Sequence, residues 1–112
     1  MDNDAFSIQK SKPAERLKHS LTYGNLWIYV LSLINEQGDV YAYTLSESIE
    51  KEFLFRPNRI MLYIVLYKLE AEGIIKSKEK NKERRKYYLL TKKGSRLLKF
   101  AKEYLRNLSS RV

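Results

Sequence analysis

Basic side chains are crowded into one short stretch of the chain, where seven of the eleven residues 76–86 are Lys or Arg. Ammonium and guanidinium groups bind phosphate oxygens, so this stretch is suited to holding a polyanion and not to making or breaking bonds. The residues that we expect to contact phosphates are Lys78, Lys80, Asn81, Lys82, Arg84, Arg85 and Lys86. A solvated surface that keeps the protein soluble is the other interpretation of such a run.

The placement of charge along the chain bears on these two interpretations. The formal net charge of the whole chain is +9. Residues 74–90 hold seven basic and two acidic side chains, and residues 91–112 hold seven and one, whereas residues 21–73 are acidic overall. Because the positive charge is concentrated in two segments, it favours binding of double-stranded DNA over a general role in solubility.

Other kinds of chemistry find little support in the composition. The 112 residues include no Cys and a single His, His19, so sulfur or imidazole nucleophiles and zinc sites are not expected. The four glycines stand apart, so no glycine-rich phosphate loop is present. We therefore predict no enzyme activity, no catalytic residue, no metal and no cofactor. No segment resembles a membrane span, which predicts a cytoplasmic protein associated with the nucleoid.

The residues that precede the basic stretch are expected to form a helix. Four apolar side chains recur at the spacing i, i+3, i+4, i+7, and these are Leu62, Val65, Leu66 and Leu69. Pro is tolerated in a first helical turn and Gly commonly follows a last one, so Pro57 and Gly73 predict a helix over 57–73. Alternation in residues 74–80 and 85–90 then predicts a hairpin with its tip at 81–83.

Two further helices are expected upstream. The first should begin near residue 22 or 25, run to about residue 36 and bury one stripe, made of Leu26, Trp27, Val30, Leu31 and Ile34. After an extended link at 40–43, Thr44 and Glu47 have the form of a capping box and predict a helix to about residue 53. This helix and the one over 57–73 make a helix-turn-helix. With the hairpin behind it, the sequence predicts a winged helix-turn-helix, a mainly α fold with a small β-hairpin.

The start of the helix over 57–73 is where such a fold presents side chains to base edges and phosphates. The candidates lie largely off the apolar stripe and are Arg56, Asn58, Arg59, Met61 and Tyr63. Arg suits a bidentate contact with guanine and Asn one with adenine. An ordinary solvated helix start is the alternative for Asn58 and Arg59, and packing against neighbouring helices is the alternative for Met61 and Tyr63.

The C-terminal residues predict a final helix over 92–108, with Thr91 as its N-cap. Its apolar side chains follow helical spacing and include Leu97, Leu98, Ala101, Tyr104, Leu105 and Leu108. We expect this stripe to pair two copies of the chain as a homodimer, the alternative being that the helix folds onto residues 25–36 of its own chain. The expected organisation is an N-terminal arm (1–20) with a helix near 14–21, a DNA-binding domain (21–90) and a dimerisation helix (91–112).

Four segments carry a resemblance to a known family. They read LWIYVL at 26–31, YAY at 41–43, YIVLYKLEAEG at 63–73 and RKYYLLTKKG at 85–94. In this order and spacing, the chain resembles the PadR family of winged-helix transcriptional regulators, in particular its short archaeal members. The resemblance implies a homodimeric DNA-binding protein, usually a repressor, with Tyr63 in the recognition helix. Many members have Pro directly after this Tyr and Gly-Thr before it, whereas this chain has Ile64, Ile60 and Met61.

These observations predict a sequence-specific transcriptional regulator, a repressor, that acts as a homodimer. The alternatives are a non-specific DNA-binding architectural protein and a winged helix that binds proteins. The resemblance also implies that some relatives bind phenolic or drug-like molecules, and the tyrosines and Trp27 offer a lining for such a site. Because a Trp on an apolar helix stripe is usually part of the core, our hypothesis is that no small-molecule effector is obligatory.

Overall fold

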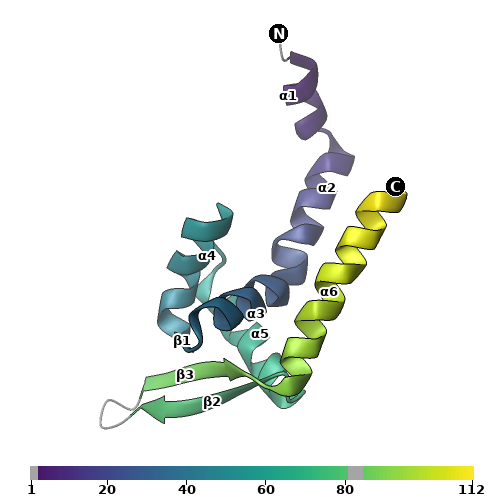
Figure 1. Ribbon diagram of the computed structural model, residues 1–112. Helices are drawn as coiled ribbons and strands as arrows, with labels where there is room; N and C mark the ends of the chain where they lie inside the picture. The colour runs from purple at the N-terminus through teal and green to yellow at the C-terminus, as the bar shows by residue number, and fades with distance from the viewer. Residues whose placement is uncertain (1–2, 81–84) are drawn as a thin grey trace.

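Figure 1 shows the computed structural model of the chain, which describes residues 3–80 and 85–112. Helix α3 lies at the centre and contacts α4, α5, α6 and strand β3. In chain order the elements are α1 (Asn3–Gln9), α2 (Lys12–Leu21), α3 (Leu26–Gln37), β1 (Val40–Tyr41), α4 (Leu45–Phe53), α5 (Arg59–Ala71), β2 (Ile75–Lys80), β3 (Arg85–Leu90) and α6 (Lys92–Arg111). The predicted helix-turn-helix and hairpin are therefore confirmed as α4, α5 and β2–β3.

The sheet has three strands in the order β1-β3-β2, and both pairs are antiparallel. Strand β2 pairs with β3 from Ile75 opposite Leu90 to Lys80 opposite Arg85. The predicted extended link at 40–43 is only partly correct, because Val40 and Tyr41 pair with β3 while Ala42–Thr44 form a turn of 3-10 helix. The predicted hairpin tip, 81–83, lies outside the described residues.

The hydrophobic core surrounds α3. The predicted stripe is buried except for Trp27, which is half-buried, and Leu33 is buried as well although the stripe omitted it. Leu33 is covered because α3 is enclosed on several sides and not on one. The core residues contributed by the other elements are Val40, Leu45, Ile49, Leu62, Leu66, Leu69, Ile74, Ile75, Tyr88 and Leu98.

One predicted cap and one predicted helix start differ from the structure, although α4 does begin directly after Thr44 as predicted. The capping box at Thr44 is wrong: its Oγ1 donates to the Tyr41 carbonyl at 3.0 Å, and its backbone is helical, whereas an N-cap needs an extended backbone. Helix α5 begins at Arg59 and not at Pro57, because the Asn58 side chain accepts a hydrogen bond from the Met61 amide at 3.1 Å and caps the helix there. The predicted cap at Thr91 is confirmed, since its Oγ1 accepts from the Gly94 amide at 3.1 Å.

The N-terminal arm is more helical than expected, and two helices, α1 and α2, occupy it. Helix α2 starts early because Ser11 accepts a hydrogen bond from the Ala14 amide at 3.4 Å and Pro13 is acceptable in a first turn. Over residues 4–21, no side chain is buried. The arm therefore projects from the core (Figure 1), attached through its last turn, where the Tyr29 hydroxyl donates to the Leu21 carbonyl.

Gly94 fixes the start of α6 against the turn between α5 and β2. A Cβ atom at this position would lie 2.2 Å from the Ile74 carbonyl oxygen, so the two backbones must separate if the residue is larger. We expect Gly94→Ala to lower the free energy of unfolding by about 1–3 kcal/mol, despite a gain of about 1 kcal/mol in helix propensity. Urea denaturation measures this, with exposed Ser95→Ala as the control that should shift stability by less than about 0.5 kcal/mol. An unchanged Gly94→Ala midpoint would contradict the close packing.

Candidate nucleic-acid interface

Helix α5 presents one end and one side to solvent. Arg59 is its first residue and is exposed, and Met61 and Tyr63 are exposed in the following turn. The opposite side carries Leu62 and Leu66, which are buried in the core. The three predicted contact residues of the first two turns therefore remain accessible to a ligand from outside the molecule.

The two predicted contact residues that precede α5 already have partners. Arg56 donates from Nη1 to Glu50 Oε1 at 3.2 Å, an ion pair that is about half exposed on each side. Asn58 uses its side-chain oxygen for the helix cap. A bidentate contact between Asn58 and adenine needs that same oxygen, which would then have to accept from both the Met61 amide and the adenine amino group.

The hairpin carries basic side chains into solvent directly after α5. Lys76 and Lys78 on β2 and Lys86 on β3 are exposed, and Glu79 stands opposite Lys86. Arg85 donates from Nη1 to the Tyr43 hydroxyl at 2.9 Å and lies over the Tyr43 ring, 5.2 Å from its centroid. Of the other predicted phosphate contacts, Asn81, Lys82 and Arg84 lie outside the described residues, as does the side chain of Lys80.

A polar junction joins α5 to the hairpin. The Ser77 hydroxyl on β2 donates to Glu70 Oε2 on α5 at 2.6 Å. Burial raises the pKa of the Tyr88 phenol on β3, and the nearby Glu70 carboxylate and Tyr63 phenol raise it further. Tyr63 and Glu70 therefore lie on the side of α5 that faces the sheet. This junction links α5 to β2 beside the basic strands, whose Ile75 and Tyr88 are anchored in the core.

Three further exposed residues of α5 were not among the predicted DNA contacts. Ile60, Ile64 and Tyr67 are exposed and lie on the side opposite the core. Their spacing of four and three is itself helical, so the sequence contained a second apolar stripe on this helix. Only the stripe through Leu62 and Leu66 was predicted to be apolar, because a surface helix is expected to bury a single apolar face.

A comparison with protein-family models shows which family has this sequence pattern. Residues 30–100, more than half of the chain, match the model of the Transcriptional regulator PadR-like family. The chain belongs to this family. The match confirms the resemblance to the PadR family, and with it the prediction of a non-enzymatic, DNA-binding transcriptional regulator, while the likeness to short archaeal members stays a prediction.

Solved structures of PadR proteins have the same fold. A PadR family regulator from hypervirulent Clostridium difficile R20291 is 28% identical, with a TM-score of 0.69 over 75% of this chain and 90% of that chain. The PadR family regulator from Eggerthella lenta DSM 2243 is 28% identical, with a TM-score of 0.74 over 86% and 85%. A winged-helix DNA-binding protein from STIV shares the fold at 22% identity, with a TM-score of 0.66 over 75% and 89%. No curated protein matches the sequence significantly.

The C-terminal helix of this PadR chain divides its predicted dimerisation residues into two groups. Leu98 and Ala101 are buried and Leu97 is half-buried, because the first half of α6 packs on α3 of its own chain. These three residues therefore pack within their own chain, which was the alternative to pairing with a second copy. Tyr104, Leu105 and Leu108 are exposed and remain available to a second copy.

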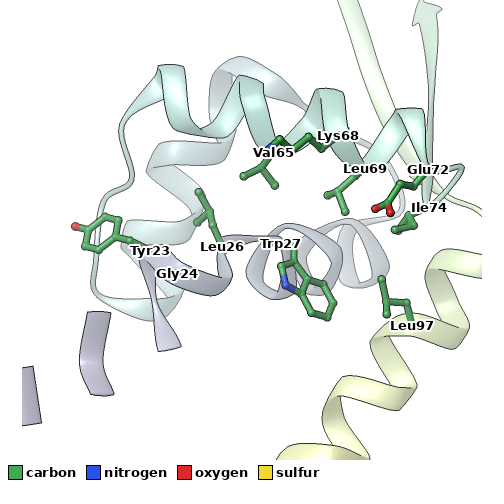
Figure 2. A pocket seen from close by; sticks show the side chains of 10 residues that line it. All are labelled: Tyr23, Gly24, Leu26, Trp27, Val65, Lys68, Leu69, Glu72, Ile74 and Leu97. Atoms are coloured by element: carbon green, nitrogen blue, oxygen red, sulfur yellow. The ribbon is translucent and has the colours of Figure 1, made fainter. Parts of the chain in front are cut away.

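A cavity of about 260 Å³ lies between α3, α5 and the start of α6 of the PadR fold. Figure 2 shows Trp27 of α3 and Leu97 of α6 on one side and Val65, Lys68 and Leu69 of α5 on the other. The Trp27 indole donates to Asn25 Oδ1 at 3.2 Å, so its polar edge is already paired. Trp27 therefore packs partly against the core and partly lines the cavity.

The part of the chain that the structure describes contains no candidate metal site and no candidate membrane span. Groups of His, Asp and Glu able to hold a metal ion do not occur among residues 3–80 and 85–112. Within those same ranges, no helix has the length and apolar character to cross a membrane.

Proposed function

We propose that this PadR protein is a homodimeric, sequence-specific repressor that places α5 in the major groove and the basic hairpin on the phosphates. The observation that carries the proposal is the juxtaposition of an accessible helix start with an exposed, basic hairpin. Arg59, Met61 and Tyr63 are exposed in the first two turns of α5. Lys76, Lys78 and Lys86 are exposed on the strands that follow α5 in the chain. A groove-reading helix with phosphate contacts beside it is how helix-turn-helix proteins bind a duplex.

The N-terminal half of α5 also has the electrostatic character that this proposal needs. A helix start carries partial positive charge from its unpaired amides, and Arg59 adds a full charge at the first position. Arg56 contributes less, because Glu50 neutralises it. We therefore assign base and phosphate contacts in this region mainly to Arg59, Met61 and Tyr63.

The homodimer is supported by an apolar groove that the chain leaves uncovered. A cavity of about 230 Å³ lies between the start of α3 and the second half of α6. Its apolar walls are Leu21, Trp27, Ile28, Phe100, Ala101, Tyr104, Leu105 and Leu108. Exposed apolar groups gathered in this way mark an interaction site, and a second copy of α6 is the partner that would cover both grooves at once.

Selection of bound duplexes from a random pool, at about 150 mM salt with unselected DNA as competitor, tests the proposed function. A homodimer predicts enrichment of a palindrome whose half-sites lie about one helical turn apart. Binding without enrichment would instead indicate the architectural alternative, which the net charge of +9 favours. Absence of DNA binding would indicate a protein-binding winged helix. Repression itself is tested by placing the selected palindrome over a reporter promoter, where expression of the protein should lower the signal.

The effector hypothesis is testable because the chain has one Trp. Trp27 lines both the 260 Å³ cavity and the groove beside α6, so a ligand entering either should alter its fluorescence. We expect no saturable change in fluorescence when phenolic acids are added at micromolar concentrations. A saturable change that the variant Leu97→Trp in a Trp27→Phe background reproduces would establish a ligand in the larger cavity and contradict the hypothesis.

A further inference from the structure

The outward side of α5 is apolar, although it faces solvent. Ile60, Ile64 and Tyr67 are 70%, 50% and 75% exposed. Directly opposite on the same helix, Leu62, Leu66 and Leu69 are at most 5% exposed. The helix is therefore apolar on two sides, of which the domain core accounts for only one.

This second apolar side needs a physical explanation. The solvent side of a surface helix is normally polar, and a helix that is apolar all round is normally buried. Ile60, Ile64 and Tyr67 lie in successive turns, so their side chains form one continuous patch instead of isolated exposed residues. Such patches on soluble domains commonly mark interaction sites.

The charges around the patch restrict what it can bind. Exposed Arg59 and Lys68 flank it on α5, and the exposed lysines of β2 and β3 follow in the chain. An apolar protein partner would gain nothing from this basic border. A DNA duplex matches both the basic border and the apolar patch. Its phosphates are anionic, and its major groove carries one apolar group, the C5 methyl of thymine.

We propose that Ile60, Ile64 and Tyr67 contact thymine methyl groups, so that the operator half-site presents thymines to this face of α5. The inference rests on the proposed function, since it assumes that α5 enters the major groove. It names residues that set specificity, and it predicts a feature of the operator. Ile60 and Ile64 have no polar group with which to contact a base edge, so hydrogen-bonded readout falls to the flanking Arg59 and to the Tyr67 hydroxyl.

The experiment removes the methyl group and leaves base pairing unchanged. Each thymine of the selected operator is replaced by deoxyuridine, and the affinity is measured at one salt concentration. Burying one methyl group against an aliphatic side chain changes affinity by about fourfold, so uracil at a contacted position should weaken binding by about that factor. Uracil outside the half-sites should have no effect.

A thermodynamic cycle then ties the methyl group to the protein. For Ile64→Ala, the discrimination between thymine and uracil should fall to about onefold at the contacted position, because the side chain that covered the methyl is gone. The matched control is Ile8→Ala, an isoleucine that is 66% exposed on α1, at the end of the molecule away from the hairpin (Figure 1). This control should retain the full discrimination between the two bases.

The outcomes separate this inference from the function on which it rests. Sequence-specific binding that tolerates uracil at every half-site thymine would overturn the methyl contact and leave the regulator in place. Equal affinity for all duplexes would overturn both. A change of oligomeric state in Ile64→Ala, with no loss of discrimination against uracil, would show that the patch binds a second copy of the chain and would also overturn the inference.

Discussion

Replacement of Lys78, Lys80, Lys82 and Lys86 by Ala is expected to weaken binding to every duplex by about 100-fold or more, whatever its sequence. Lysines that neutralise phosphates release counterions from DNA, so their loss also reduces the dependence of affinity on salt. The slope of log K against log salt should become shallower by about one for each lysine that contacts a phosphate. Affinity measured between about 50 and 200 mM salt gives both quantities.

The matched control for this prediction removes the same charge from another part of the chain. Lys10, between α1 and α2, and Lys12, Arg16 and Lys18 on α2 are exposed on the N-terminal arm, which projects away from the hairpin (Figure 1). Their replacement by Ala should leave the slope nearly unchanged, because charges beyond a Debye length of about 8 Å are screened at physiological salt. If both quadruple variants change the slope equally, binding depends on total charge and the hairpin has no specific role.

Introduction of a carboxylate into the exposed part of the α6 stripe is expected to produce the other large effect. Tyr104 and Leu108 are exposed and line the groove beside α3. The double variant Tyr104→Asp with Leu108→Asp would bury two charges at the proposed interface and should yield a monomer. Because a dimer holds its two α5 helices on one duplex, loss of pairing should lower operator affinity by at least about 100-fold.

Sedimentation equilibrium and operator binding on the same samples test this second prediction. Ser110→Asp is the matched control, since it adds a carboxylate to the exposed end of the same helix outside the groove. It should remain dimeric and bind the operator as the unaltered protein does. A double variant that stays dimeric would place the interface elsewhere, and one that is monomeric but binds normally would separate dimerisation from DNA binding.

The two effects differ in what they reveal. Loss of the lysines acts on the common, sequence-independent part of affinity, whereas loss of the dimer removes one of two half-site contacts. Discrimination between operators should therefore survive the lysine variant and fall in the monomer. Removal of thymine methyl groups acts on discrimination alone. Together the three experiments assign phosphate contact, pairing and base readout to the hairpin, α6 and α5 respectively.

The sequence by itself determined the order and type of the main elements. The spacing of apolar residues located α3, α5 and α6, the Thr44 and Glu47 pattern located α4, and the alternation after Gly73 gave the bounds of β2 and β3 to within about one residue. The distribution of charge pointed to a polyanion, and the spacing of four segments identified the family before any comparison. These features were accessible because they depend on local periodicity and composition, which are properties of the chain alone.

Only the tertiary structure decided which apolar and polar groups remain available for binding. Leu98 and Ala101 are covered by their own chain while Tyr104 and Leu108 are not, and this depends on where α6 leaves α3. The Asn58 side chain caps α5, and Arg56 forms an ion pair with Glu50. The spacing of residues along the chain does not predict either contact. For α5, both stripes have helical spacing, so the sequence could not say which one is buried. The positions of α3 and α4 settle that choice, and the stripe that they leave exposed is the one we assign to DNA.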